Sequence, residues 1–203
     1  MESRYEELST DEADFIIELM EEVVFFVKKL KIEDTQFMRR AFCRSVFQFV
    51  DGIASDIKAE VMKDEAPTTI GDEAYLALQD KKIIGKGDKK KVVKKKSGFA
   101  KNIDFAFDIY GWTNGIELNL KKSKEWQRFQ KCIAIRNRVV HPKTLEDMRV
   151  SDHDMKDMLK TFTWLREELT SAREKVAIDI LNQIDAMRSA FFAQHTSSQG
   201  LDD

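Results

Sequence analysis

The strongest constraint on this sequence is that apolar residues recur at helical spacing over long stretches that contain few chain breakers. The 203 residues include eight glycines and two prolines. Glycine and proline are the residues least favourable inside a helix, and they supply many of the turns of a strand-rich fold. Their scarcity therefore favours long helices over an architecture of short strands and tight turns.

Helical periodicity locates the main elements of the chain. One such stripe begins at Met38 and ends at Val61, and the two residues Ala66-Pro67 mark the end of that helix. Pro142 requires another helix to finish by His141, because proline disfavours helical geometry at the preceding residue. The predicted long helices span residues 11–30, 35–62, 123–141 and 152–194, and shorter ones span 72–78 and 99–110. Ser9 with Glu12 forms a capping box for the first helix, and Ser171 with Glu174 could restart the last one after a bend.

These helices predict one all-α domain, residues 1–195, built as a helical bundle of four to five major helices. The final residues, 196–203, are predicted to form a disordered tail. A small irregular or hairpin insertion is expected around residues 64–100, where two short apolar runs flank Gly85 to Asp88.

The insertion is rich in lysine. Between Lys81 and Lys101 there are ten lysines and a single acid, Asp88. One interpretation is a segment that attracts nucleic acid or an acidic partner. The other is a solvated excursion whose charge keeps an exposed edge soluble.

Composition narrows the cellular setting. The longest apolar run, Val23 to Val27, is far shorter than the roughly 20 residues of a membrane span, so no membrane association is expected. The acidic N-terminus is the reverse of a secretory signal. Cys43 and Cys132 lie in helical patterns and are predicted to be small buried hydrophobes in a reducing compartment. A cytoplasmic protein is therefore expected. The chain has no cluster of metal-ligand spacing and no phosphate-binding glycine loop, so no metal or cofactor is predicted.

One charged residue interrupts an apolar stripe. In the helix that ends by His141, the stripe runs through Trp126, Phe129, Ile133 and Val140, and the position that completes its spacing is Arg136. A guanidinium buried without a counter-charge would cost several kcal/mol. Arg136 therefore needs an anion, which is either a carboxylate such as Asp51 or Asp56, or a phosphate that a ligand brings.

His141 follows Arg136 after four intervening residues, at the exit of the same helix. With the polar Asn137 directly after the arginine, this segment resembles the motif of the HEPN superfamily, which consists of an Arg, four to six residues and a His. The order of elements is also similar to that family: two long helices, a variable middle, the motif helix and a long closing helix. The motif covers about ten residues, whereas the agreement in architecture extends over most of the chain.

The resemblance implies a metal-independent endoribonuclease, with Arg136 and His141 as catalytic residues. Cleavage through the ribose 2′-hydroxyl needs a base, an acid and a cation that faces the phosphate. Imidazole exchanges protons near neutral pH, and guanidinium matches phosphate oxygens with a planar set of donors. Because one motif supplies one histidine, the family resemblance implies a homodimer with both motifs in one cleft. Asn137, Arg138 and Lys143 would bind the RNA substrate, and the lysines of 81–101 could line its approach.

The resemblance also implies a biological role, and two other hypotheses about function stand beside the nuclease. A toxin or a phage-defence effector is one such role, and an antitoxin protein would then be a further partner. A second hypothesis keeps the HEPN-like fold as a non-catalytic module that binds RNA, a nucleotide or a protein. A third treats Arg136 as a structural ion pair and His141 as an accidental neighbour. His153 and His195 lack an arginine at motif spacing and are predicted to be structural or merely exposed.

Overall fold

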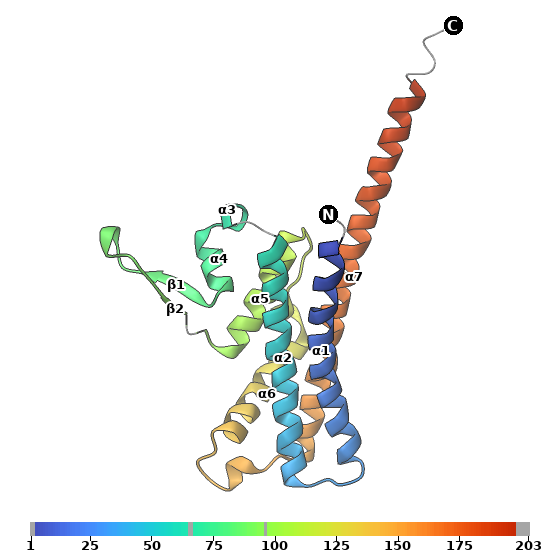
Figure 1. Cartoon of the computed structure of the whole chain (residues 1–203). Helices are drawn as coiled ribbons and strands as arrows, with labels where there is room; N and C mark the ends of the chain where they lie inside the picture. The colour runs from blue at the N-terminus through green and yellow to red at the C-terminus, as the bar shows by residue number, and fades with distance from the viewer. Residues whose placement is uncertain (1–2, 65–66, 96, 198–203) are drawn as a thin grey trace.

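The computed structural model describes residues 3–64, 67–95 and 97–197, with side chains described for 15–63, 69–87, 89–95 and 97–189. It is an all-α bundle with a small hairpin insertion (Figure 1). The long helices are α1 (Ser3–Leu30), α2 (Gln36–Asp64), α5 (Phe99–Thr113), α6 (Lys124–Val140) and α7 (Asp152–Ser197). The shorter elements are the helices α3 (Pro67–Ile70) and α4 (Asp72–Leu78) and the antiparallel strands β1 (Lys81–Ile84) and β2 (Lys91–Lys94).

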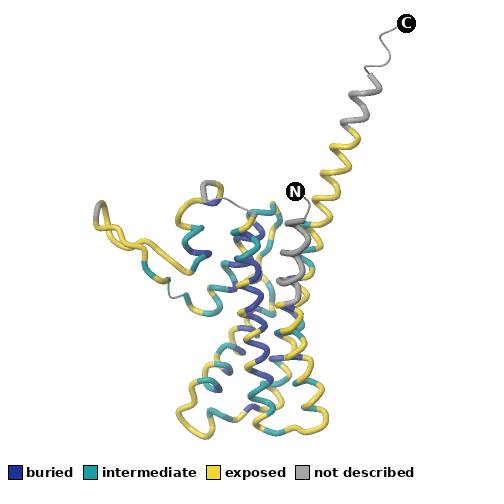
Figure 2. The backbone as a smooth tube through the Cα atoms, viewed as in Figure 1, coloured by how far each residue is buried: buried dark blue, intermediate teal, exposed yellow. Residues whose placement is uncertain are grey.

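Helix α2 is the central element of the bundle and packs against α1, α5, α6 and α7. Its predicted stripe is buried: Phe42, Phe49, Ile53 and Ile57 are each at most 1 % exposed. Figure 2 shows the buried positions following α2 through the middle of the bundle. The three-four spacing of these residues puts them on one helix face, and neighbouring helices cover that face.

Phe129 of α6 lies at the centre of an aromatic cluster in the core. Its ring lies 5.3 Å from the ring of Trp126, 6.2 Å from those of Phe99 and Trp164, and 6.4 Å from that of Phe47, measured between centroids. These partners come from α2, α5, α6 and α7. One aromatic cluster therefore joins four helices and fixes the position of α6 in the bundle.

A partly buried ionic cluster holds α7 on α2. Arg173 Nη2 donates to Asp56 Oδ2 at 2.6 Å and to Glu60 Oε2 at 3.0 Å. Burial works to lower the pKa of Arg173, but the two carboxylates outweigh that effect and the pKa is raised. Asp56, one of the two acids considered as a partner for Arg136, is therefore paired with Arg173.

Both cysteines are free and fully buried, as predicted. Burial is the main cause that raises the pKa of the Cys43 thiol to about 12 and that of Cys132 to about 11. At neutral pH both thiols are protonated, so neither is a ready nucleophile.

Some predicted boundaries differ from the structure. The first helix begins at Ser3 and not at Asp11, which places Ser9 inside the helix. The predicted restart at Ser171 is wrong, because α7 continues through that residue without a break. The predicted tail, 196–203, lies outside the described residues from 198 onward, and α7 ends at Ser197. Among the helices of the described ranges, none is long and apolar enough to cross a membrane.

Candidate active site at the end of helix α6

Helix α6 begins and ends where local sequence requires. The Ser123 hydroxyl accepts the N–H of Glu125 at 3.1 Å and caps the first turn. At the other end, the His141 N–H donates to the Asn137 carbonyl at 2.9 Å, and His141 leaves helical geometry with φ −124° and ψ 58°. The proline that follows enforces this exit. The motif therefore occupies the last turns of α6, as predicted.

The buried face of α6 differs from the predicted stripe. Its buried residues are Trp126, Phe129, Cys132, Ile135 and Val139. Ile133, Arg136 and Val140 are partly buried and lie at the edge of that face. Arg136 is predicted on a face that meets the core or a partner, and the structure places it, partly buried, at the edge of the core-facing side, because Cys132 and Ile135 supply an alternative set of apolar positions.

Arg136 lies in a groove between α2, α5 and α6. The groove encloses about 250 Å³ and is lined by Arg44, Phe47, Gln48, Asp51, Phe99, Arg136 and Val140. The guanidinium carbon of Arg136 lies 5.8 Å from the centre of the Phe99 ring, within the range of a cation–π contact. Its Nη1 donates to Asn137 Oδ1 at 3.1 Å, so the residue after the arginine helps to orient it.

Arg136 has no ion pair with any carboxylate among the residues that the structure describes. Asp51 lines the same groove without forming such a pair, and Asp56 binds Arg173. The interpretation of Arg136 as the structural partner of one of these two acids therefore has no support in the structure.

His141 comes directly after the last groove residue in the chain. It is exposed and directly follows Val140, which lines the groove, although His141 itself is not a lining residue. Among the described residues, its imidazole has no hydrogen-bond partner. Asn137 and Lys143 are likewise exposed. The structure thus brings Arg136, Asn137 and His141 to one end of α6.

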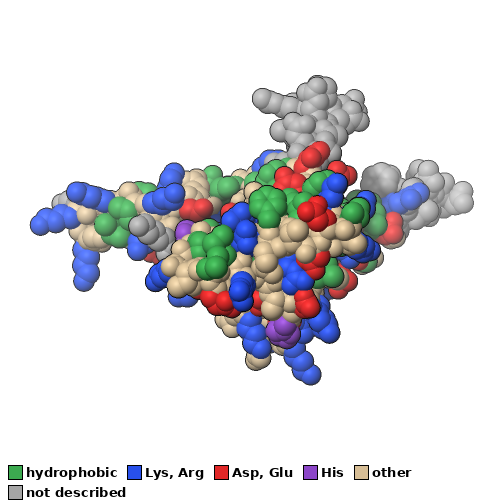
Figure 3. All heavy atoms as spheres, turned by 90° about the horizontal axis from the view of Figure 1, so that it is seen from below, with side chains coloured by type: hydrophobic (Ala, Val, Ile, Leu, Met, Phe, Trp, Pro, Cys, Tyr) green, Lys and Arg blue, Asp and Glu red, His purple; other side chains and the backbone are tan. Residues whose placement is uncertain are grey.

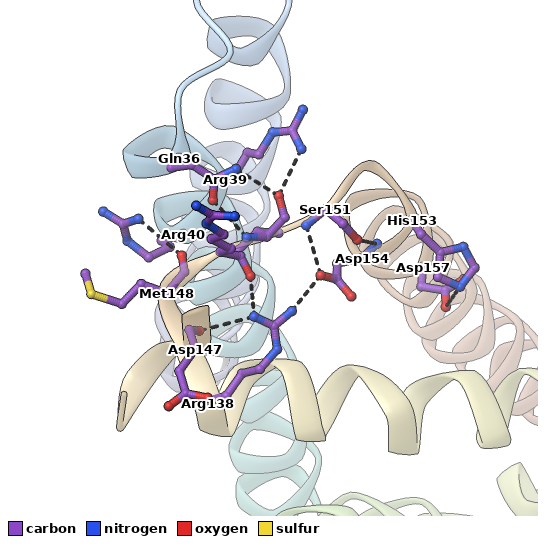
Figure 4. Close-up of polar contacts among 12 residues, drawn as sticks. Gln36, Arg39, Arg40, Arg138, Asp147, Met148, Ser151, His153, Asp154 and Asp157 are labelled. Atoms are coloured by element: carbon purple, nitrogen blue, oxygen red, sulfur yellow. Dashed lines mark hydrogen bonds and ion pairs between the residues drawn. The ribbon is translucent and has the colours of Figure 1, made fainter. Parts of the chain in front are cut away.

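Arg138 does not line that groove, and its side chain belongs to a network at the start of α7 (Figure 4). Its guanidinium forms an ion pair with Asp154 at 2.6 Å and donates to the carbonyls of Asp147, at 3.1 Å, and Arg149. It lines a separate hollow of about 610 Å³, in which Arg39 and Asp152 also lie. These contacts connect the last turn of α6 to the following loop and to α7.

The loop after His141 is held at several points. Asp147 Oδ2 accepts the N–H groups of Lys143 and Thr144, each at 2.9 Å, and these bonds lower the pKa of the Asp147 carboxyl. Ser151 and Asp154 cap α7 reciprocally: the Asp154 N–H donates to Ser151 Oγ at 3.2 Å, and the Ser151 N–H donates to Asp154 Oδ2 at 2.9 Å.

Side chains from α2 fix the same loop from the other side. Gln36 Nε2 donates to the Val150 carbonyl at 3.1 Å, while the Val150 N–H donates to Gln36 Oε1 at 2.8 Å. Arg39 also donates to Val150 O at 2.9 Å, and Arg40 donates to Met148 O at 3.3 Å. The chain direction on leaving α6 is therefore defined, and with it the position of the His141 backbone.

Sequence reasoning missed the wall of the groove that α2 supplies. Arg44 and Gln48 are exposed, lie one helical turn apart and line the groove with Asp51. A polar row at four-three spacing along the exposed side of α2 was the available signal. Its relation to Arg136 is a tertiary one, because the two segments are distant in the chain.

The other histidines have separate surroundings. His153 is exposed and its Nε2 lies 3.5 Å from Asp157 Oδ2, in accord with the predicted exposure and carboxylate neighbours. The side chain of His195 lies outside the described residues. Within the described part of the chain, no three His, Cys, Asp or Glu side chains are grouped so that they could hold a metal ion.

Comparison of the chain with protein-family models, with curated proteins and with solved structures finds no match in any of the three. The geometry of the groove and of the α6 terminus is therefore the basis on which a function is inferred.

Proposed function

We propose that the protein is a metal-independent endoribonuclease of HEPN type, in which Arg136 binds the scissile phosphate and His141 transfers a proton. The observation that supports this most directly is the charge of Arg136. It is partly buried in a groove, and no described carboxylate forms an ion pair with it, although Asp51 lines the same groove. A phosphodiester would supply the missing anion, and His141 directly follows the groove residue Val140 in the chain.

The residues of the groove suit a nucleic-acid strand. Arg44 from α2 and Arg136 from α6 bring two guanidinium groups to one groove, and Arg44 has no ion pair with any described carboxylate. Guanidinium groups bind phosphate oxygens through paired hydrogen bonds. Phe99, which lines the same groove, offers an aromatic surface, and Gln48 offers an amide that can donate or accept.

The proposed reaction is an internal transesterification. The 2′-oxygen attacks phosphorus as a base removes its proton, the bond from phosphorus to the 5′-oxygen breaks, and an acid protonates the departing oxygen. The products are a 2′,3′-cyclic phosphate and a 5′-hydroxyl. Since one chain has one motif histidine, a homodimer that faces two α6 termini would supply both base and acid.

The test is incubation of RNA with the purified full chain in excess EDTA, followed by analysis of the product ends. We expect cleavage that yields cyclic phosphate and 5′-hydroxyl ends, and we expect the variant Arg136→Ala to leave the RNA intact. The matched control is Arg166→Ala, an exposed arginine on α7 that is paired with Glu167 at 3.9 Å. Cleavage that requires added metal, or cleavage by Arg136→Ala at the wild-type rate, contradicts the proposal.

A second candidate function is a non-catalytic module that binds RNA in the same groove. The position of His141 favours it, since this residue follows the groove without lining it. RNA that binds in an Arg136-dependent manner but stays intact under all conditions would select this function over the nuclease.

A further inference from the structure

The lysine-rich insertion is an ordered hairpin that extends from the side of the bundle (Figure 1). Strands β1 and β2 pair antiparallel, with Lys81 opposite Lys94, Lys82 opposite Val93, Ile83 opposite Val92, and Ile84 opposite Lys91. Viewed from below, Lys and Arg side chains extend from this end of the molecule (Figure 3).

The register places lysines on both faces of the ribbon. Residues opposite one another share a face, and successive residues alternate between faces. Lys81 and Lys94 therefore lie on one face, and Lys82 and Lys91 lie on the other. Three more lysines, Lys86, Lys89 and Lys90, are exposed at the tip.

The positive charge of the hairpin is not compensated within the described part of the chain. None of the lysines on the two strands or at the tip forms an ion pair with a described carboxylate. Lys81 and Lys94 are like charges at directly opposite positions, which destabilises a hairpin, and a two-stranded ribbon is only marginally stable by itself. The lysines therefore do not serve the stability of the fold.

The base of the hairpin is nevertheless fixed to the bundle. Lys58 of α2, only 4 % exposed, donates to Asp80 Oδ1 at 2.8 Å and to Asn102 Oδ1 at 2.5 Å. The Lys95 N–H donates to the Asp80 carbonyl at 2.6 Å, which closes the base of the ribbon. These contacts hold the hairpin in a defined direction relative to the bundle. A segment that served only solubility would not need such an anchor.

We infer that the hairpin inserts into the groove of a nucleic-acid duplex, where its two lysine faces contact phosphates on opposite walls. A two-stranded ribbon fits a groove about 12 Å wide, such as the major groove of B-form DNA. The deep groove of regular A-form RNA is too narrow, and a bulge or internal loop is needed to widen it. Bulged RNA and duplex DNA share this chemistry. A flat acidic protein surface, in contrast, meets one face of a ribbon at a time.

This inference deepens the proposed function and rests on it for the choice of RNA as the ligand. Strand β2 ends at Lys94, and α5 begins at Phe99, which lines the groove of Arg136. The short connection places the base of the hairpin close in the chain to the candidate active site. A stem bound by the hairpin would then present its adjoining unpaired strand to Arg136.

The test measures RNA binding by fluorescence anisotropy in the full chain with His141→Ala, which prevents cleavage during the measurement. One variant carries Lys81→Gln and Lys94→Gln, a second carries Lys82→Gln and Lys91→Gln, and a third carries all four. Glutamine removes the charge and the like-charge repulsion and keeps a polar side chain only slightly shorter than lysine, so the hairpin should remain folded in each variant. The matched control replaces two exposed lysines of α7, Lys156→Gln and Lys160→Gln.

We expect each face variant to weaken binding to a bulged RNA stem at least about threefold, and the combined variant to lower the salt dependence. Four lost phosphate contacts reduce the slope of log K against log salt by about 3.6. Single-stranded RNA and the control should be unaffected. If the hairpin lysines contributed more to the binding of a DNA duplex than to that of the bulged RNA stem, the groove that the hairpin enters would be that of DNA.

If RNA binding depended on one lysine face alone, the hairpin would lie on the RNA by one face, and insertion into a groove would be overturned. If RNA binding depended on neither face, the hairpin would not contact the RNA and the inference would be overturned outright. Equal losses for single-stranded RNA would also overturn it. The test measures binding without cleavage, so it can be told apart from a failure of the nuclease proposal. If the protein is not a nuclease, the hairpin variants still lose RNA affinity, while the protein with an intact His141 does not cut RNA.

Discussion

Replacing His141 with alanine should reduce the rate of RNA cleavage by a factor of about 10² to 10⁴, the usual contribution of a positioned general acid or base. RNA affinity should change by less than about twofold, because the imidazole is exposed and does not line the groove that holds Arg136. The measurements are single-turnover cleavage at saturating protein and RNA binding at equilibrium.

The structure offers a matched control in His153, which is also exposed but lies beside Asp157 and does not line the groove of Arg136. His153→Ala should cleave at the wild-type rate. If His141→Ala retained a rate within about threefold of wild type, the assignment of a proton-transfer role to His141 would be wrong. If it lost affinity and rate together, His141 would be a binding residue instead.

Replacing Phe129 with alanine should lower the free energy of unfolding by about 3–5 kcal/mol. Phe129 is fully buried, and its ring packs against aromatic rings from α2, α5, α6 and α7. Alanine would leave a cavity where four helices meet, and little of it could close. Urea denaturation, followed by circular dichroism, measures the change.

Phe25 is the control for this substitution, because it is 51 % exposed on α1. Phe25→Ala should alter the free energy of unfolding by less than about 1 kcal/mol. A loss below about 1.5 kcal/mol for Phe129→Ala would show that α6 is not held by this cluster, and the positions given for Arg136 and His141 would lose their structural basis.

The elements that could be predicted from the sequence are those whose signals are local. The α2 stripe from Met38 to Val61, the short helix at 72–78 and the hairpin around Gly85 each depend on neighbouring residues, and each is present in the structure. The burial of α6 could not be predicted to the residue. Its apolar positions allow two overlapping stripes, and packing against α7 and α2 decides between them.

The candidate site could likewise be predicted only where its residues are close together in the chain. Arg136, Asn137 and His141 share one helix end, so their proximity follows from spacing. The sequence predicts that Arg138 binds substrate. The structure shows its guanidinium engaged by Asp154 and two loop carbonyls, which helical periodicity does not reveal. Arg44 was missed because only the packing of α2 beside α6 brings it to the groove.

The central claim is that the positive charge of Arg136 is free to hold a phosphate. The most direct measurement is the dissociation constant for RNA of His141→Ala and of the double variant Arg136→Ala/His141→Ala, at one fixed low salt concentration. Hydrogen bonds to a charged group contribute about 1.5–3 kcal/mol, so binding should weaken by about 10- to 150-fold without Arg136. Equal dissociation constants for the two proteins would contradict the account.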